Sequence, residues 1–272
     1  MLISHRDIDG VGLGTAPFAF RDGSLEDSLA TVHAALDAGV ELIDTALAYT
    51  RPDVESYAEA VVATALRGVA NPPLVATKGG HWREGDRFPV DGRPETLRAH
   101  CEISLRSLDV ERIDLYQLHH VDPEVPITES IAALAAMQAE GLIGAIGLSN
   151  VTEEQLDEAG AVAEIASVQN RLSYARPDDL RLAQLCAERG IAYLAYMPFD
   201  GGGAPVAPAI EEVARRREVS PQRVMVGWLR AMSPSIVPLV GASRPASIAD
   251  SADLLDLTSD DLYLLGSGVP GR

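Results

Sequence analysis

The stretch ELIDTALAYT, residues 41–50, begins as a short apolar run and ends in a polar loop. Asp44 closes the apolar run, and Tyr49 lies in the loop that follows it. Two later apolar runs end in the same way, at Lys78 in LVATKGG and at His119 in DLYQLHH. If these runs are neighbouring strands of a parallel barrel, their carboxyl ends meet on one face, where such folds carry their chemistry. We therefore predict that the four side chains lie together.

Eight short apolar runs with β-rich composition recur along the chain and predict strands. They are VGLG at 11–14, ELID at 41–44, LVAT at 74–77, IDLYQL at 113–118, GAIGLS at 144–149, ASVQN at 166–170, AYLAY at 192–196 and SIVPLVG at 235–241. Strands that are apolar on both faces and alternate with amphipathic helices indicate parallel pairing with the helices outside. The pattern predicts an α/β fold, a closed (β/α)8 TIM barrel rather than an open sheet.

The segments between these runs have helical periodicity. Apolar residues spaced for one buried face are Leu25, Leu29, Val32 and Leu36, and later Leu97, Cys101, Leu105 and Leu108. Thr152 with Gln155 forms a capping-box pattern, and Ser220 with Pro221 forms a cap followed by proline at the first helical position. We expect extra helices near the C-terminal end, before and after the eighth strand. GGGAP at 201–205 is expected to be a mobile loop, and we treat residues 1–272 as one domain.

The composition limits the classes of partner. A net charge of −18 and a pI near 4.6 oppose binding to nucleic acid or to an anionic membrane surface. No apolar run is long enough to predict a membrane helix, and MLISHRDIDG does not resemble an export signal, so a cytoplasmic location is expected. Cys101 and Cys186 have no metal or redox spacing and are interpreted as reduced packing residues.

The four polar groups at the strand ends suggest a reaction. A tyrosine phenol has an ordinary pKa near ~10, so it exchanges a proton near neutrality only if its surroundings stabilise the phenolate. Lys78 is expected to do so, while Asp44 keeps the ammonium charged and in place. His119 is expected to orient a carbonyl oxygen. Such a set protonates an oxygen that gains negative charge, which points to carbonyl reduction with hydride from a nicotinamide cofactor.

An ordered set of motifs resembles the aldo-keto reductases over nearly the whole chain. The motifs are ELIDTALAY, ATKGG, DLYQLHHVDP, IGLSN, SVQNRLS, AYMPF and VPLVGASRP. The resemblance implies a barrel that binds NADP(H), with Tyr49 as general acid or base, Lys78 and Asp44 tuning it, and His119 in the substrate pocket. Within the family, GGHWREGDRFPVDGRPETLR most resembles bacterial reductases described as pyridoxal or general aldehyde reductases.

The resemblance also implies a set of cofactor-binding positions. Ser149 and Asn150, with Gln169 beside them, should bind the nicotinamide carboxamide, and Tyr196 should stack on its ring. The segment from Met197 to Gly203 should border the pyrophosphate. The complete predicted set is Gly14, Thr15, Asp44, Ser149, Asn150, Gln169, Tyr196, Met197, Pro198, Gly203, Gly241, Ser243, Arg244, Ser247 and Asp250.

The adenosine end of the predicted cofactor site departs from many relatives. Ser243 and Arg244 are the expected holders of the 2′-phosphate, because a guanidinium suits phosphate geometry. Many relatives carry a Glu-Asn pair in the following helix, where we align Asp250 and Ser251. NADP(H) is therefore favoured, and NAD(H) is kept as an alternative. A short loop after Tyr196 predicts a more open substrate mouth.

Aromatic residues follow the first and third predicted strands and are expected in loops on the catalytic side. They are Phe18, Phe20, His81 and Trp82. Either they line a pocket for an apolar or aromatic carbonyl substrate, or they pack against the barrel rim. We place Phe18 and Trp82, with His120, in the predicted substrate site.

Two other motifs have simpler interpretations. Gly10, Gly12 and Gly14 do not complete a dinucleotide fingerprint, because Pro17 replaces the third required glycine and no helix is expected in FAFRDG. His119 and His120 are adjacent, so in a strand their side chains should point to opposite faces, and no metal site is expected. His5, His33 and His100 are expected to be surface or packing residues. Arg215, Arg216 and Arg217 are expected to form a solvated helix face.

The primary hypothesis is an NADPH-dependent oxidoreductase that interconverts an aldehyde or ketone and its alcohol, a small-molecule substrate. One alternative is a cofactor-binding regulatory subunit of the same fold with little catalysis. Another is a barrel enzyme that uses Lys78 as a Schiff base. The sequence does not determine the substrate, the physiological direction or the number of subunits.

Overall fold

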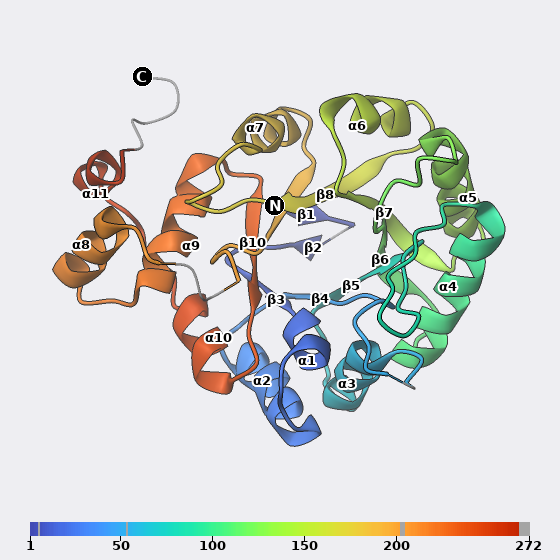
Figure 1. Ribbon diagram of the computed structural model, residues 1–272, viewed down its shortest axis with the longest axis horizontal. Coiled ribbons are helices and arrows are strands. Elements are labelled where there is room, and N and C mark those ends of the chain that lie inside the picture. The colour runs from blue at the N-terminus through green and yellow to red at the C-terminus, as the bar shows by residue number, and fades with distance from the viewer. Residues whose placement is uncertain (5, 53, 202–204, 267–272) are drawn as a thin grey trace.

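The computed structural model of the chain describes residues 1–4, 6–52, 54–201 and 205–266. Within them, eight parallel strands close into a barrel, with helices around the outside (Figure 1). The strands are β3 (Gly12–Gly14), β4 (Leu42–Asp44), β5 (Leu74–Gly79), β6 (Ile113–Leu118), β7 (Ile143–Ser149), β8 (Ile165–Arg171), β9 (Ala192–Tyr196) and β10 (Ile236–Gly241). Each strand pairs with the next along the chain, and β10 pairs with β3 to complete the ring. The predicted (β/α)8 TIM barrel is confirmed.

The helices connect successive strands and cover the barrel. They are α1 (Ala16–Phe20), α2 (Leu25–Asp37), α3 (Tyr57–Leu66), α4 (Pro94–Leu108), α5 (Ile127–Ala139), α6 (Glu153–Gly160), α7 (Leu180–Glu188), α8 (Pro208–Arg217), α9 (Pro221–Met232), α10 (Pro245–Ala252) and α11 (Ser259–Leu264). The extra helices predicted around the eighth strand are α8 and α11, which lie outside the main ring (Figure 1).

Local signals in the sequence account for several helix ends. Thr152 forms the capping box predicted for α6, with its side chain bound to the Gln155 amide. Ser220 caps α9 and Pro221 occupies its first turn, which separates α8 from α9 as expected. The buried face of α2 differs from the prediction, because Leu25 is 49% exposed and lies at the start of the helix.

The interpretation of the glycine run at residues 10–14 was partly wrong. The residues after the glycine run do begin a helix, because α1 starts at Ala16 with Pro17 in its first turn. This helix has five residues, and the preceding strand β3 is part of a closed barrel. The run therefore does not belong to an open dinucleotide-binding sheet, although the argument from a missing helix was wrong.

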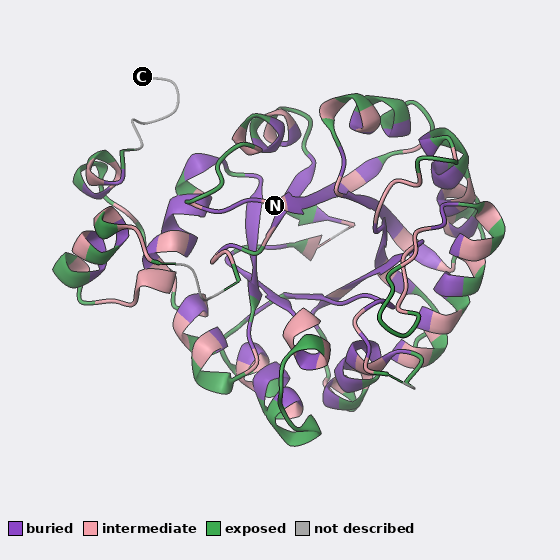
Figure 2. Cartoon of the chain, viewed as in Figure 1, coloured by how far each residue is buried: buried purple, intermediate pink, exposed green. Residues whose placement is uncertain are grey.

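Alternation along the strands places polar groups inside one end of the barrel. Successive strand residues point to opposite faces, so Leu74, Ala76 and Lys78 of β5 share the inner face. All three are fully buried, and strands are among the most deeply buried parts of the chain (Figure 2). The barrel interior is thus apolar toward the amino ends of the strands and polar at their carboxyl ends. The polar end is the expected position of a site.

A short hairpin covers the opposite end of the barrel. Strands β1 (Leu2–Ile3) and β2 (Arg6–Asp7) pair in antiparallel fashion outside the barrel sheet. Ile3 and Ile8 are buried in the same apolar cluster as Leu42 of the barrel interior. The hairpin therefore seals the amino end, and small molecules reach the polar groups from the carboxyl end.

The two cysteines behave as the sequence indicated. Cys101 and Cys186 are buried, and neither is in a disulfide. Burial raises the pKa of each thiol to about 12, so both stay protonated at neutral pH. Among the helices that the structure describes, none is both long and apolar enough to cross a membrane.

Candidate active site

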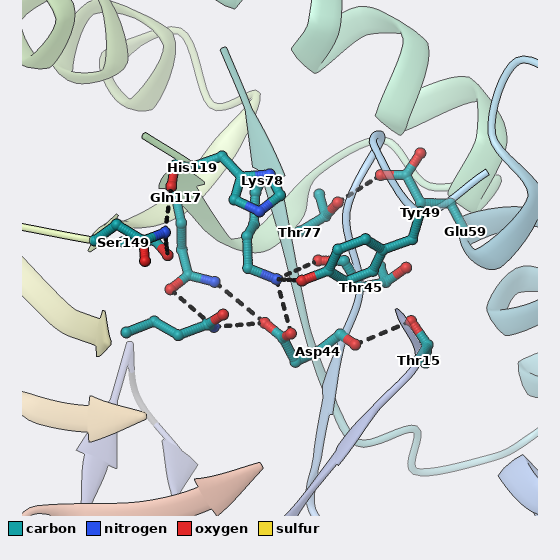
Figure 3. Close-up of polar contacts among 12 residues, drawn as sticks. Thr15, Asp44, Thr45, Tyr49, Glu59, Thr77, Lys78, Gln117, His119 and Ser149 are labelled. Atoms are coloured by element: carbon teal, nitrogen blue, oxygen red, sulfur yellow. Dashed lines mark hydrogen bonds and ion pairs between the residues drawn. The ribbon is translucent and has the colours of Figure 1, made fainter. Parts of the chain in front are cut away.

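A buried Lys–Asp–Tyr group lies at the carboxyl end of the barrel (Figure 3). The Lys78 Nζ donates to Asp44 Oδ2 at 2.7 Å, to the Thr45 carbonyl at 2.8 Å and to Tyr49 Oη at 3.2 Å. These contacts use all three hydrogens of the ammonium group. Its side chain is fully buried, and that of Asp44 is 4% exposed. The convergence predicted for these residues is confirmed.

The second carboxylate oxygen of Asp44 is held by two glutamines. Gln169 Nε2 donates to Asp44 Oδ1 at 2.7 Å, and Gln117 Nε2 donates to the same oxygen at 3.3 Å (Figure 3). Gln117 is fully buried and was missed in the sequence. Strand alternation was the available signal, because Gln117 lies two residues after Leu115 of the barrel interior, on the same face of β6. The carboxylate is therefore oriented from both sides.

The pKa of the Tyr49 phenol is higher than predicted. Burial raises the pKa of Tyr49, the nearby Lys78 ammonium lowers it, and the Asp44 carboxylate raises it again. The net effect is a raised pKa, so the expected stabilisation of the phenolate is outweighed. The reason is desolvation, which disfavours the charged form and cannot be read from the spacing of residues. In the ground state the phenol is a proton donor.

The lysine keeps its charge in spite of burial. Desolvation lowers the pKa of Lys78, but the Asp44 carboxylate and the Tyr49 oxygen together raise it, and the net direction is upward. The ammonium and the carboxylate form a buried ion pair whose remaining hydrogen-bonding groups are satisfied. Lys78 is thus a permanent positive charge beside the Tyr49 oxygen.

His119 lies against the tyrosine, with ring centroids 5.8 Å apart. It is 7% exposed, and burial followed by the Lys78 charge lowers its pKa well below the usual value, so the ring is neutral. Its Nδ1 is buried and has no hydrogen-bond partner among the described residues. Buried N–H groups without acceptors are rare, so the tautomer with its proton on Nε2 is favoured.

The predicted carboxamide-binding residues form a connected chain. Tyr196 Oη donates to Asn150 Oδ1 at 2.7 Å, and Asn150 Nδ2 donates to the His119 carbonyl and to Ser149 Oγ. Asn150 has a φ of +58°, a left-handed conformation that asparagine tolerates better than most residues. The chain joins the ends of β6, β7 and β9.

A buried carboxyl lies behind the site and was also missed. Glu59 of α3 is fully buried and accepts a hydrogen bond from Thr77 Oγ1 at 2.5 Å (Figure 3). It accepts a second one from Ser56 Oγ at 2.6 Å. Burial raises the pKa of Glu59. Thr77 precedes Lys78 and faces the helices, so Glu59 braces the outer side of the strand that carries the lysine.

A cavity of about 710 Å³ extends from Asp44 and Tyr49 across the ends of β9, β10 and β3. This volume is in the usual range for small-molecule and cofactor sites. Arg21 Nη2 donates to the Gly201 carbonyl at 3.0 Å, and both residues line the cavity, so two of its walls are connected. Gln222 and Pro17 are further lining residues that the sequence did not indicate, whereas Phe199 belongs to the segment that was predicted to border the pyrophosphate.

Most of the predicted cofactor residues lie in this cavity wall. Those that line it are Gly14, Asp44, Tyr196, Met197, Pro198, Gly241, Arg244, Ser247 and Asp250, together with Ser251. Met197 has a φ of +52°, an uncommon conformation at a loop that borders the cavity. Asp250 accepts a hydrogen bond from Ser220 Oγ at 2.6 Å.

The other predicted cofactor residues do not line the cavity. Thr15 is fully buried and donates through Oγ1 to the Asp44 carbonyl at 3.0 Å, so its hydroxyl is used inside the protein. Ser149, Asn150 and Gln169 belong to the network around Asp44 and His119, next to the cavity. Ser243 is outside the lining, which includes its neighbour Arg244. Gly203 lies outside the described residues, as does most of the 201–205 loop.

None of the three predicted substrate residues, Phe18, Trp82 and His120, lines the cavity. Phe18 is 2% exposed and packs in the hydrophobic core, whereas Phe20 lines the cavity. The two residues belong to the helix α1, where positions two apart face different directions, and this reverses their expected roles. Trp82 packs edge-on against His100 with centroids 5.2 Å apart and does not line the cavity.

His119 and His120 do not point to opposite faces as predicted. Their rings stack with centroids 5.0 Å apart and an interplanar angle of 13°. Strand β6 ends at Leu118, so strand alternation no longer applies to them. In the part of the chain that the structure describes, no group of His, Cys, Asp or Glu side chains is arranged to hold a metal ion.

The remaining histidines fit simple roles. His100 is buried, and its Nδ1 accepts a hydrogen bond from the Gly80 amide at 3.1 Å. His33 is exposed on α2, and His5 lies outside the described residues. Of the arginine run on α8, Arg215 and Arg216 pair with Glu212. These two residues lie on a solvated face, as expected, whereas Arg217 is half-buried and pairs with Asp261 of α11.

Fold and site together define a (β/α)8-barrel protein with a buried Asp–Lys–Tyr group and a histidine at the mouth of a cofactor-sized cavity. Residues 10–265 match the Aldo/keto reductase family, and the chain belongs to this family. It is an oxidoreductase of that family.

Named relatives and solved structures agree with this assignment. The chain is similar to pyridoxine 4-dehydrogenase of Escherichia coli, with 31% identity over 88% of this chain and 85% of the relative. It is similar to the structure of glycerol dehydrogenase from Gluconobacter oxydans, with a TM-score of 0.83, 30% identity, and 98% and 93% of the two chains covered. An aldo/keto reductase from Klebsiella pneumoniae, solved in complex with NADP and acetate, shares the fold at a TM-score of 0.82 and 23% identity, with 97% and 93% covered.

Proposed function

We propose that this protein reduces an aldehyde or ketone to the alcohol with NADPH, and catalyses the reverse oxidation, with Tyr49 as the general acid or base. The observation that carries the proposal is the position of the Tyr49 phenol, 3.2 Å from the charged Lys78 amine and at the edge of the large cavity. A carbonyl oxygen beside this phenol receives a proton as negative charge develops on it.

The surroundings of Tyr49 suit a proton donor. Its raised pKa keeps the phenol protonated before reaction. When the proton leaves, the phenolate oxygen lies beside an ammonium that already donates to it, so the developing charge is stabilised without rearrangement. Asp44 and its two glutamines hold the ammonium in place.

His119 supplies a second contact for the substrate oxygen. A neutral ring with its proton on Nε2 donates a hydrogen bond, and the unpartnered Nδ1 favours this tautomer. The ring contacts Tyr49 edge-on, so an oxygen between the two groups receives hydrogen bonds from both. We propose that His119 orients the carbonyl and that Tyr49 moves the proton.

The cavity suits a nicotinamide dinucleotide. Tyr196 offers a ring face for stacking, and Gly14 and Gly241 line the cavity without side chains, so a cofactor can approach the backbone closely there. Arg244 provides an exposed guanidinium at the end where the adenosine phosphate would lie. The bound cofactor would supply hydride to the carbonyl carbon. The proposal includes these individual contacts and the preference for NADPH over NADH.

The comparisons support this chemistry. The names of pyridoxine 4-dehydrogenase and glycerol dehydrogenase each describe an alcohol that is oxidised, and the Klebsiella structure contains NADP. The match with the E. coli relative also agrees with the sequence resemblance to pyridoxal reductases. We propose that residues 1–272 act as one catalytic domain, because the family match covers most of the chain.

A Tyr49→Phe variant tests the proposal. NADPH binding, followed through nicotinamide fluorescence, should stay nearly unchanged, because the ring and its packing remain. Turnover of a broad aldehyde panel should fall by at least about 10³-fold, since the general acid is removed. Turnover that stays within a few-fold of the wild-type rate would refute the role of Tyr49.

The two alternatives predict different results. A Schiff base requires a neutral lysine amine, whereas Lys78 has a raised pKa and three hydrogen bonds. Borohydride trapping of Lys78 in the absence of NADPH would favour that alternative. A regulatory subunit would bind NADPH tightly, turn over no carbonyl, and form a stable complex with another protein.

A further inference from the structure

Three imidazole rings meet beside the candidate catalytic tyrosine. The ring centroid of His81 lies 4.8 Å from that of His119 and 4.7 Å from that of His120, and His119 and His120 stack at 5.0 Å. His81 comes from the segment after β5, and the other two come from the segment after β6. We call these residues the imidazole cluster.

Several nitrogens of the imidazole cluster are not used by the protein. His81 Nδ1 lies 3.0 Å from the Pro89 carbonyl, which only accepts, so the proton is on Nδ1 and Nε2 is a free acceptor. The ring of His120 makes aromatic contacts but no hydrogen bond to any described residue. The buried Nδ1 of His119 has no partner. A buried polar atom without a partner, such as this Nδ1, is unusual inside proteins. His81 and His120 are half-buried, so their free nitrogens are open to a ligand.

The imidazole cluster is uncharged at neutral pH. Burial, followed by repulsion from His81 and Lys78, lowers the pKa of His120 to about 4. Burial also lowers the pKa of His81, and that of His119 is well below its usual value. A neutral imidazole has one donor and one acceptor, which matches a hydroxyl group rather than an anion. All three hydrogens of the Lys78 ammonium are already donated within the protein, so Lys78 offers none to a substrate anion.

Further aromatic rings connect the imidazole cluster to the wall of the large cavity. Phe88 stacks on His81 at 5.7 Å, Phe20 contacts Phe88 at 5.9 Å, and Phe20 contacts Tyr49 at 6.0 Å. Tyr49 contacts His119 at 5.8 Å, which closes the circuit of rings. Phe20 also lines the large cavity. The circuit therefore places the apolar rings of Phe20 and Phe88 next to imidazole rings that have free nitrogens.

We infer that His81 and His120 form a subsite that binds a hydroxyl group of the substrate, so that the enzyme selects hydroxylated aldehydes over apolar aldehydes of the same shape. The inference rests on the proposed function and names the substrate class for that site. The carbonyl lies between Tyr49 and His119, a hydroxyl on a neighbouring carbon reaches the other imidazoles, and the C–H faces pack on Phe20 and Phe88. These side chains are specificity determinants and carry out no chemical step.

Paired substrates test this subsite. Glyceraldehyde and 2-methylbutanal have the same branched skeleton, with methyl groups in place of the two hydroxyls. His120→Phe keeps a stacking ring but removes both nitrogens. It should lower kcat/KM for glyceraldehyde about 10-fold, the equivalent of one lost hydrogen bond, and change that for 2-methylbutanal little. Comparing the ratio of the two constants between variant and wild type cancels the hydration of each aldehyde in solution.

Two further variants sharpen the result. His120→Gln restores a donor and an acceptor and should recover most of the glyceraldehyde activity. His33→Phe makes the same change on the exposed face of α2 and should leave both constants unchanged. Equal losses for both aldehydes in His120→Phe, or no loss for glyceraldehyde, would overturn the subsite.

A binding measurement separates this inference from the proposed function. Long-range ¹H–¹⁵N spectra report the imidazole nitrogens of His81 and His120 during titration with glycerol. A shift in these nitrogens, absent with 2-methylbutan-1-ol, supports the hydroxyl subsite even if neither aldehyde is reduced with NADPH, a result that would refute only the proposed function. Turnover of the aldehydes with no glycerol-dependent shift and no change of substrate ratio in His120→Phe would overturn the subsite alone.

Discussion

Replacing Lys78 by Met should lower the free energy of unfolding, because it breaks the buried ion pair between Lys78 and Asp44. The methionine fills much of the lysine volume but leaves the Asp44 carboxylate, 4% exposed, without its cation. Gln169 at 2.7 Å and Gln117 at 3.3 Å still donate to one oxygen, while the oxygen that accepted from Lys78 loses its partner. Tyr49 loses the ammonium that donates to its phenol.

The size of the effect follows from burial. Removing one partner of a buried ion pair lowers the free energy of unfolding by about 3–5 kcal/mol, because the other charge stays uncompensated. The two glutamine contacts keep Asp44 partly satisfied and place the loss near about 3 kcal/mol. For a chain of this size the melting temperature should fall on the order of 10 °C.

A double-mutant cycle tests the reasoning. Asp44→Asn with Lys78→Met removes both charges while the asparagine oxygen can still accept from Gln169, so the double variant should be more stable than Lys78→Met by about 2 kcal/mol. Urea or thermal unfolding of the two single variants and the double variant gives the coupling energy. Both Lys78 variants should lack turnover. A loss under about 1 kcal/mol for Lys78→Met, or strictly additive single losses, would refute the account of the buried pair.

Two more results are expected. Arg244→Ala should weaken NADPH binding about 10- to 100-fold, the range for hydrogen bonds to a charged group, and change NADH binding little. Fluorescence titration with both cofactors measures this, and equal losses would contradict a 2′-phosphate contact. Glu59→Gln should alter the pH dependence of stability. Burial raises the pKa of Glu59 above the usual value of 4.5, so the folded state binds more protons than the unfolded state as pH rises from there. Wild-type stability should therefore fall, relative to Glu59→Gln, between pH 4.5 and the raised folded pKa, with a slope of up to about 1.4 kcal/mol per pH unit. Urea midpoints at a series of pH values measure the difference, and a difference independent of pH would show that Glu59 is not desolvated.

Local patterns predicted the barrel because they repeat in a simple way. Each apolar run was long enough for one strand, and each was followed by helical periodicity. The order of strands and helices could therefore be predicted without tertiary information. The same logic located Asp44, Lys78 and His119, since each lies at or next to the carboxyl end of a strand. Tyr49 was placed with them by its position in the loop directly after Asp44, and the family resemblance implied its role as general acid or base.

The errors arose where a helix or strand began or ended at a residue other than the predicted one. The α1 helix turned Phe18 into the core and Phe20 toward the cavity, although both were expected in a loop. The end of β6 at Leu118 allowed His119 and His120 to stack, although strand alternation predicted opposite directions. Element boundaries are the least certain part of any pattern, and side-chain direction depends on them.

The sequence by itself determined the eight strands, their order, and the polar groups at their carboxyl ends, because these depend on hydrophobic periodicity within short windows. Only the tertiary structure decided that Gln117 and Gln169 donate hydrogen bonds to Asp44 and that Glu59 lies behind the strand that carries Lys78. It also decided that the Tyr49 phenol stays protonated. Desolvation and contact between distant residues exist only after the barrel closes, so no local pattern carries them.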